Sequence, residues 1–355
     1  MAYNDSYQQI EEGTLPLFHQ KRYYPVKIGN ISKQRYRIIA KLGYGAYSTV
    51  WLARDEIETD HPGLDFTRLA LDIFEIDGPH GRPCCIATKP QGSSLRALQE
   101  ILPDAILPRM MVKSLVHRLW FSVNWLHATC GVVHTDISPQ NVLTAASDEI
   151  IFKNIEEQES QDPGTPIMND GVPIYRSRSS IVELSGIPIL TDFGQMRLAD
   201  PMSNDWWMPD LYRAPEVLLK LPWAFPVDVW SVGVMTLKLL ERRNLFDPID
   251  REHNQYVLPL ALSQYIGYLG PPPLEMIKRS PLFRTYFDQD GNWISEPPIP
   301  ETSLENFLTT VPPGEEKEML LKFIRKILTW DPEVRATSSE ILEDEWLMRP
   351  VDDIM

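Results

Sequence analysis

The spacing of apolar residues changes along the chain, and this change predicts the order of the elements. Residues 35–54, RYRIIAKLGYGAYSTVWLAR, alternate apolar and polar side chains on either side of a glycine-containing turn, which predicts a β-hairpin. Strand-like apolar runs follow in 66–78 and 83–88, with the turn GPHGR between them. Within 108–130 the spacing becomes helical and predicts a long amphipathic helix with Leu115, Leu119, Val123 and Leu126 on one face.

The second half of the chain is predicted to be mainly helical. A helix is expected after Pro226, because the fixed φ of proline suits a first helical turn. Its sequence, VDVWSVGVMTLKLLE, is apolar on nearly every side, which is typical of a buried helix. Another helix, KEMLLKFIRKIL, precedes the segment WDPEVRAT. Because strands come first and helices follow, the sequence predicts an α+β protein with two lobes of different class.

Charge and composition exclude several classes of protein. The formal net charge is −15, which does not suggest a nucleic-acid binder, because lysine and arginine bind phosphate backbones. It would suit a basic peptide partner, although most acidic proteins carry their charge only for solubility. No apolar stretch approaches the roughly 18 residues of a membrane helix, so no membrane association is expected. Three cysteines without metal spacing suit a reducing compartment.

The strongest chemical signal is the octapeptide HTDISPQN at 134–141. It places Asp136 five residues before Asn141, as in the kinase catalytic-loop pattern H-R-D-x-x-x-x-N. Phosphoryl transfer explains the spacing, because a carboxylate must face the attacking hydroxyl while an amide oxygen nearby holds a metal ion on the phosphates. Taken alone, the segment could also be a turn with an Asx cap.

Further markers follow in a fixed order. The tripeptide DFG at 192–194 comes after the apolar run IPILT, which places a carboxylate at a strand end beside a flexible glycine. The tripeptide APE at 214–216, Asp228 in the predicted buried helix, and Arg335 near the end complete the series. Each could be a common turn or cap, but together they resemble a protein kinase over roughly residues 35–349.

The resemblance can be narrowed to the SR-protein kinase branch, particularly its fungal members. It is carried by YYPVKIGN and RYRIIAKLGYGAYSTVWLARD, by DGPHGR before the hinge, by HTD in place of HRD, and by LYRAPEVLL. It implies a protein-kinase-like bilobal fold with a reduced β-rich small lobe and a mainly α-helical large lobe. The implied divisions are an N-terminal extension at 1–33, a truncated small lobe at 34–88, a large catalytic lobe at 89–349 with an insert at 144–188, and a tail at 350–355.

The insert is acidic at first, with the sequence EEQESQDP, and then rich in turn residues. Family relatives carry an insert at this place. A surface loop is the preferred interpretation, and a docking element is the alternative.

The resemblance also implies the parts of a phosphoryl-transfer site that uses ATP and Mg²⁺. Asp136 would be the catalytic base, and Asn141 and Asp192 would bind Mg²⁺. ATP would be held by the hairpin and the hinge, at Gly43, Gly45, Ser48, Val50, Lys89 and Gln91. Three residues would organise the large lobe: Asp228 would accept hydrogen bonds from the catalytic loop, and Glu216 would pair with Arg335. A helix N-cap is the alternative role of Asp228.

One part of the kinase pattern is missing. A working kinase needs a lysine on its third strand and a glutamate on helix C to hold that lysine. This chain has no lysine between Lys41 and Lys89, and about five residues stand where an average strand and helix would occupy roughly 25. The third strand and helix C are therefore predicted to be absent, which would uncover apolar surface. The candidate substitutes for the missing cation are Lys41, Arg54 and Arg68.

Three hypotheses follow. The first is a serine/threonine kinase that phosphorylates basic, Arg/Ser-rich proteins, acts as a monomer, and resides in the cytoplasm, the nucleus or both. The second is a pseudokinase that serves as a protein-interaction module. The third is an incomplete gene model or splice form of an active kinase. Phosphorylation of the activation segment is not expected as a switch, because Thr135 replaces the arginine that would bind the phosphate and Ser203 is the one hydroxyl between Asp192 and Tyr212.

Overall fold

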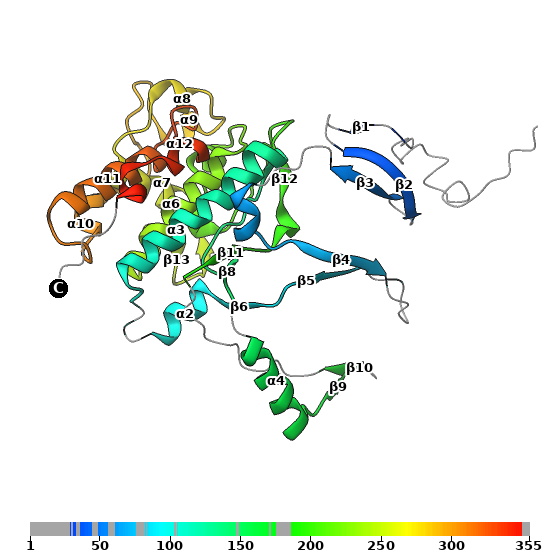
Figure 1. Ribbon diagram of the computed structural model, residues 1–355. Coiled ribbons are helices and arrows are strands. Elements are labelled where there is room, and N and C mark those ends of the chain that lie inside the picture. Colours follow the sequence, from blue (N-terminus) through cyan, green and yellow to red (C-terminus); the bar gives the residue numbers. More distant parts are fainter. Residues whose placement is uncertain are drawn as a thin grey trace, which may run out of the picture. The chain divides into compact units, whose positions relative to one another are not determined.

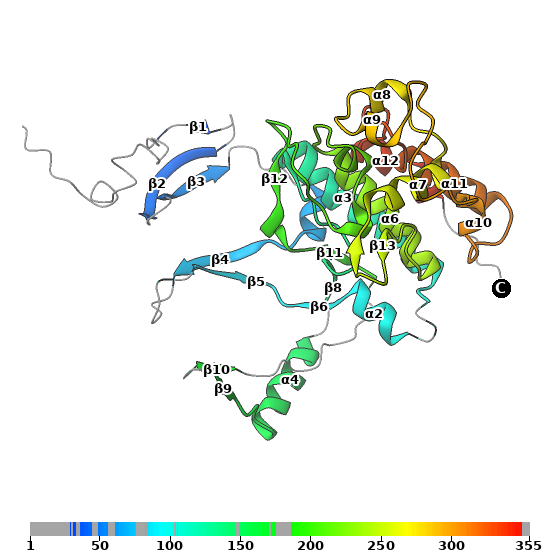
Figure 2. The same cartoon turned by 180° about the vertical axis from the view of Figure 1, so that it is seen from behind.

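In the computed structural model the chain forms two units, residues 1–60 and 61–355 (Figures 1 and 2). The described residues are 29, 31–32, 36–44, 49–55, 61–75, 82, 84–102, 104, 106–146, 149–169, 172–174 and 186–349. In this part of the chain no helix is both long enough and apolar enough to cross a membrane.

The first unit contains an antiparallel sheet of three strands in the order β1-β2-β3. Its strands are β1 (Ile31–Ser32), β2 (Tyr36–Tyr44) and β3 (Thr49–Asp55). The β2–β3 pair confirms the predicted hairpin. Its register shifts twice on the β2 side, and Gly43 lies opposite Val50. Only five residues separate β3 from His61, the first residue of the second unit, so no average strand and helix can fit between them.

The second unit opens with a 3₁₀ helix, η2 (Pro62–Phe66), and not with the strand predicted from residue 66. Gly63 explains the departure, because a Cβ at this position would lie 2.2 Å from the carbonyl oxygen of Phe121. The chain must therefore approach helix α3 (Arg109–Asn124) very closely here. The hydroxyl of Thr67 continues the contact with a 2.7 Å hydrogen bond to Ser122 Oγ.

Two antiparallel strands, β4 (Ala70–Glu75) and β5 (Cys84–Thr88), form a sheet of their own. Large apolar side chains on and next to them are exposed: Leu69, Leu71, Ile73, Phe74 and Ile86. The prediction that loss of helix C uncovers apolar surface stays a prediction, since these exposed side chains are described within the second unit alone.

The core of the second unit is helical. Figures 1 and 2 show α3 beside α6 (Pro226–Glu241), with α7 (Leu258–Leu269) and α11 (Glu315–Ile327) in the same bundle. The prediction that Pro226 begins a buried helix is confirmed, since Pro226 occupies its first turn and nearly all of its residues are buried. Gly233 allows close packing of α6, because a Cβ there would lie 2.5 Å from Ile327 Cγ2.

Shorter elements complete this part of the structure. The helices are α2 (Leu95–Ile101), the π-helix η4 (Trp125–Cys130), the 3₁₀ helices η5 (Phe193–Gln195) and η6 (Asp210–Tyr212), α5 (Pro215–Leu218), α8 (Leu274–Lys278), α9 (Phe283–Tyr286), α10 (Leu304–Phe307), α12 (Ser338–Leu342) and α13 (Glu345–Met348). The strands β13 (Ile249–Asp250) and β14 (Gln255–Tyr256) pair with each other.

Short strands connect the helical core to the residues of interest. A three-stranded sheet has the order β11-β8-β6, from Pro188–Leu190, Val142–Ala145 and Gln91–Ser94. Strand β7 (Val132–Val133) pairs with β12 (Arg197–Leu198). These two antiparallel sheets bring the segment before 134–141 and the segment around 192–194 to the same place.

The insert is not the surface loop that was preferred. It contains helix α4 (Glu149–Gln161) and a hairpin of β9 (Ile167–Asn169) and β10 (Val172–Ile174). The sequence EIIFKNIEEQ explains the helix, because its apolar residues recur at helical spacing and its polar residues are good helix formers. The acidic run was therefore mistaken for a loop, although EEQESQ forms the C-terminal turns of this helix.

A buried carboxylate at the end of α6 predicts a pH dependence of stability. Glu241 accepts four hydrogen bonds, two from backbone N–H groups at 2.9 Å and two from the hydroxyls of Thr309 and Thr310 at 2.6 and 2.8 Å. Burial acts to raise the pKa of Glu241, but the hydrogen bonds together hold it below the ordinary 4.5. A lowered carboxyl pKa stabilises the fold above the unfolded pKa, and this stabilisation is lost as the pH falls.

We therefore expect Glu241→Gln to lower the free energy of unfolding at pH 7 by about 1–3 kcal/mol. The difference from the unsubstituted protein should shrink below about pH 4.5, where the glutamate also becomes neutral. Urea denaturation of both proteins at several pH values measures it. A difference that stays constant with pH would refute the lowered pKa.

Candidate active site

The carboxylate of Asp228 organises the loop that follows β7. Asp228 is fully buried in α6 and accepts hydrogen bonds of 2.7 Å from the backbone N–H groups of His134 and Thr135. His127 Nε2 lies 2.9 Å from Oδ2 of Asp228, the oxygen that also accepts from the His134 N–H. Two backbone donors on one carboxylate fix the loop at the residues immediately before Asp136.

The three residues expected to carry the chemistry lie together. Asn141 Nδ2 donates a 2.9 Å hydrogen bond to the carbonyl oxygen of Asp136. The carbonyl of Asn141 in turn accepts from the backbone N–H and the hydroxyl of Thr191, both at 2.9 Å. Thr191 immediately precedes Asp192, and the antiparallel register pairs Val142 with Leu190. The β8–β11 pair therefore places Asp136, Asn141 and Asp192 at one edge of the small sheet.

The surroundings of Asp136 change the pKa of its carboxyl group. Partial burial raises the pKa of Asp136, and the negative charge of Asp192 also raises it, against the hydrogen bond from Asn141 and the proximity of His134. Asp136 is half-buried, whereas Asp192 is exposed. A half-buried carboxylate beside an exposed one suits a proton acceptor next to a metal ligand.

The segment at 192–194 is held in a defined conformation. Asp192 has a left-handed backbone with φ 63°, and its side chain caps the 3₁₀ helix η5. The ring of Phe193 packs edge-on against His134 with ring centroids 5.3 Å apart, and His134 Nε2 lies 2.9 Å from the carbonyl oxygen of Thr191. The buried histidine thus joins the segment to the loop before Asp136.

Glu216 and Arg335 form a buried bidentate ion pair away from the reacting groups. The two N–O distances are 2.7 and 2.9 Å, and both side chains are almost completely buried. Arg335 also donates to the carbonyl oxygens of Pro226 and Thr329, and its guanidinium lies over the ring of Trp230. The pair joins helix α5, the start of α6 and the segment after α11.

The residues expected to hold the nucleotide belong to different parts of the structure. Gly43 lies in β2 and Val50 opposite it in β3, whereas Gly45 and Ser48 lie outside the described residues. In the second unit, Lys89 follows β5, and its carbonyl accepts a 3.2 Å hydrogen bond from the side chain of Gln91.

A mainly apolar cavity of 650 Å³ lies next to Asp192. Its polar lining includes Asp192, Thr67, Thr88 and Arg68, and apolar side chains of β4, β5, the π-helix and the segment at 193–196 complete it. Arg68 Nε donates to Thr88 Oγ1 at 2.9 Å. Arg68 is therefore the candidate cation that shares a cavity with Asp192, while Lys41 and Arg54 belong to β2 and β3 of the first unit.

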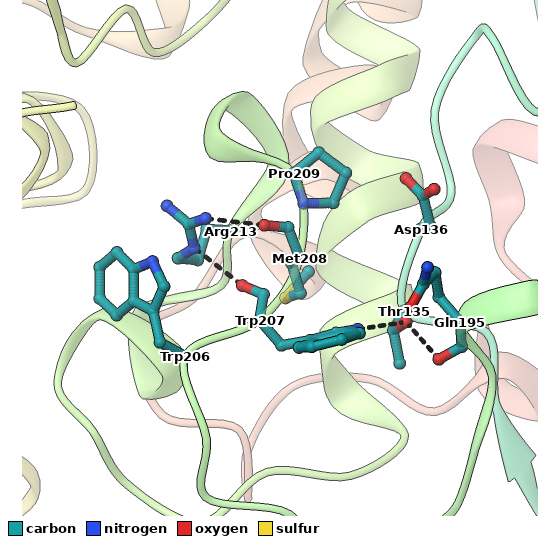
Figure 3. Close-up of a pocket in the computed structure, with 8 residues that line it drawn as sticks. All are labelled: Thr135, Asp136, Gln195, Trp206, Trp207, Met208, Pro209 and Arg213. Carbon is teal, nitrogen blue, oxygen red and sulfur yellow. Dashed lines mark hydrogen bonds between the residues drawn. The ribbon is translucent and has the colours of Figure 1, made fainter. Parts of the chain in front are cut away.

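A second cavity, of 270 Å³, opens beside Asp136 (Figure 3). Its lining residues are Thr135, Asp136, Gln195, Trp206, Trp207, Met208, Pro209 and Arg213. In Figure 3 the indole of Trp207 is directed at Thr135, and Arg213 lies at the other end of the cavity beside Trp206. This cavity therefore lies directly next to the candidate base.

Sequence reasoning missed the residues that build this cavity wall. The buried Arg213 donates to the carbonyls of Trp207 and Met208 at 2.8 and 2.7 Å, and to Asp210 at 2.8 Å. Met208 has a left-handed backbone with φ 70°. No periodic pattern in the sequence WWMPD predicts these contacts, because they depend on the path of an irregular segment.

The donor set suits Mg²⁺. Among the described residues, no three His, Cys, Asp or Glu side chains gather as a metal site. Mg²⁺ typically takes one or two carboxylates, with water and substrate phosphates as its other ligands. The carboxylate of Asp192 is exposed, and the bond from Asn141 Nδ2 does not engage the amide oxygen of Asn141. Two hard oxygen donors are thus available at the same edge.

Comparison with known proteins gives consistent matches. The protein kinase domain family matches residues 177–347. A serine/threonine protein kinase of Aspergillus fumigatus is 34% identical over 379 positions, which cover 97% of this chain and 92% of the relative. The serine/threonine-protein kinase SRPK of Physarum polycephalum is 26% identical, with the same coverage, and the dual specificity protein kinase CLK1 of Mus musculus is 29% identical over 89% of this chain and 66% of its own.

Proposed function

This chain belongs to the protein kinase family, within an SR-protein kinase-like branch, and on that premise we propose that it transfers the γ-phosphoryl group of ATP to serine hydroxyls of basic, Arg/Ser-rich proteins. The observation that carries the proposal is the meeting of Asp136, Asn141 and Asp192 at one sheet edge, joined by the hydrogen bonds of Asn141.

Each residue of this group has a role in phosphoryl transfer. Asp136 orients the substrate hydroxyl and accepts its proton. Asn141 and Asp192 hold Mg²⁺, which neutralises charge on the phosphates when it is bound. Asp228 keeps the loop before Asp136 in place through two backbone hydrogen bonds. Glu216 and Arg335 stabilise the helical core beneath.

The nucleotide would be covered by Gly43, Gly45, Ser48 and Val50 and would meet the backbone at Lys89 and Gln91. Arg68 supplies positive charge in place of the missing lysine, because it shares a cavity with Asp192 and its bond to Thr88 engages Nε alone. A guanidinium also suits phosphate oxygens, which it binds in pairs.

The proposal also covers the kind of substrate, the oligomeric state and the cellular location. A net charge of −15 favours a basic protein substrate and not nucleic acid. We propose action as a monomer, in the cytoplasm, the nucleus or both, without membrane attachment.

A pseudokinase that binds proteins is the second candidate, and the absence of lysine between Lys41 and Lys89 favours it. A dropped coding segment of an active kinase would give the same sequence. Sequencing the transcript between the codons for Asp55 and Asp60 separates a natural form from an incomplete one.

Binding of ATP·Mg²⁺ tests the proposal directly. We expect millimolar ATP with Mg²⁺ to raise the melting temperature by several degrees, because binding to the folded state stabilises it by about 2.7 kcal/mol at 100 times Kd. Arg68→Met should remove most of this shift, whereas Arg251→Met, which removes an exposed cation elsewhere, should keep it. The absence of any shift would end the kinase proposal for this polypeptide, and an undiminished shift in Arg68→Met would refute the role of Arg68.

A further inference from the structure

Thr135 has a backbone conformation that must be held by its surroundings. Its φ is 73°, in the left-handed region, which is a genuine outlier for a β-branched residue. Such a conformation costs about 1–3 kcal/mol and persists only where neighbouring contacts determine it. Because Thr135 immediately precedes Asp136, relaxation of this strain would redirect the candidate base.

Three hydrogen bonds hold Thr135 in place. Its backbone N–H donates to Asp228 Oδ1 at 2.7 Å, and its hydroxyl donates to the carbonyl oxygen of Gln195 at 3.0 Å. The same hydroxyl accepts from the indole Nε1–H of Trp207 at 3.1 Å (Figure 3). Thr135 is completely buried, so water does not replace these partners when one is lost.

Trp207 is itself fixed from two sides. The guanidinium of Arg197 lies 4.1 Å from the centre of its ring and pairs with Asp205 at 2.9 Å. Arg197 lies in β12 opposite Val133 of β7, one residue before His134. The buried Arg213 binds the carbonyl oxygen of Trp207 at 2.8 Å. Trp207 is therefore held through its ring to Arg197 of β12 and through its backbone carbonyl to Arg213 in the wall of the cavity beside Asp136.

We infer that Trp207 is a positioning residue for Asp136: its indole N–H, acting through the Thr135 hydroxyl, holds the loop of the base against the segment after Gly194. We call this Trp207–Thr135 hydrogen bond the tie. For the kinase reaction proposed above, on which this inference rests, the tie fixes the position of Asp136 relative to the wall of the cavity. The tie takes the place of the contact that an arginine at position 135 would make with a phosphorylated activation segment. The loop is then organised by an uncharged side chain of the chain itself.

Paired substitutions test the tie. Trp207→Phe removes the N–H and keeps an aromatic ring, while Thr135→Val removes the hydroxyl and keeps the shape. Each should lower kcat about tenfold with the KM for ATP unchanged, because a small displacement of a reacting group is costly to the rate. The double variant should be no slower than Thr135→Val alone, since both changes remove the same bond. Thr135→Ser, which retains the hydroxyl, should restore most of kcat.

Hydrogen exchange of residues 131–137, measured by mass spectrometry without nucleotide, provides a readout that needs no activity. Trp207→Phe and Thr135→Val should each speed exchange in this segment about fivefold, as expected for one lost hydrogen bond. The matched control is Trp293→Phe, which removes an indole bond of 3.0 Å to the carbonyl of Pro297 and should leave both kcat and this exchange unchanged.

The outcomes separate this inference from the proposed function. If the unsubstituted protein has no kinase activity but the two variants speed exchange at 131–137, the tie stands and the kinase proposal falls. Unaltered exchange in Trp207→Phe overturns the tie, whatever the activity. If Thr135→Val loses activity while Trp207→Phe keeps full kcat and exchange, the Thr135 hydroxyl acts through its bond to Gln195 and the inference for Trp207 is wrong.

Discussion

Replacement of Asp136 by asparagine is expected to lower kcat for peptide phosphorylation about 10³-fold and to leave the ATP·Mg²⁺ melting shift intact. The amide keeps the size and the hydrogen-bonding position of the side chain but cannot accept a proton, and general base catalysis contributes about 10²–10⁴ in rate. Steady-state kinetics with an Arg/Ser-rich peptide, together with the thermal shift, measures both effects. Unchanged activity would refute the assignment of the base.

The same substitution carries a prediction about stability. The pKa of Asp136 is raised in the folded protein, mainly by burial, so its contribution favours the fold at pH values below its ordinary pKa of 3.8 and is lost as the pH rises. At pH 7 the ionised carboxylate therefore weakens the fold, and Asp136→Asn should increase the free energy of unfolding. Asp290→Asn, at an exposed site, is the control and should change neither activity nor stability.

Loss of Arg335 is expected to cause the largest drop in stability. Arg335→Met leaves Glu216 as a buried, unpaired carboxylate, and breaking a buried pair in this way typically costs about 3–5 kcal/mol. The double variant Glu216→Leu with Arg335→Met should recover much of the loss, because no charge then stays buried alone. Urea denaturation measures the free energy of unfolding of each variant.

A surface pair provides the control for this prediction. Arg96 and Glu100 are four residues apart on α2, and both side chains are more than half exposed. Arg96→Met should cost less than about 1 kcal/mol, because exposed ion pairs are screened by water and salt. If Arg335→Met cost no more than Arg96→Met, the buried pair would not stabilise the core as described.

Local patterns predicted the hairpin at β2–β3 and the buried helix at Pro226, because each has a regular spacing and a turn or proline that marks its boundary. They also pointed to Asp136, Asn141 and Asp192, which the structure brings together through the pairing of β8 with β11. The kinase roles of these residues stay predictions until the substitutions are measured.

Other features could not be derived from spacing. The bond between Thr135 and Trp207 joins residues 72 apart, and no periodicity predicts where an irregular segment returns. The strand expected from residue 66 begins later, because Gly63 brings η2 against α3. Helix α4 could have been found, since the apolar residues of EIIFKNI recur at helical spacing before the acidic run.

The β4–β5 hairpin has a further consequence for partial unfolding of the second unit. Among the described strands, β4 and β5 pair only with each other, and an isolated two-stranded sheet is marginally stable in water. No described residue of β4 or β5 belongs to the buried apolar core, which lies in the rest of the second unit. Within the second unit, opening of the hairpin leaves this core intact, so a melting curve recorded without nucleotide reports the core and not the hairpin. Unfolding of this strand pair would not change the melting temperature measured without nucleotide. Its first measurable effect would be increased non-specific binding of other proteins to the exposed apolar side chains.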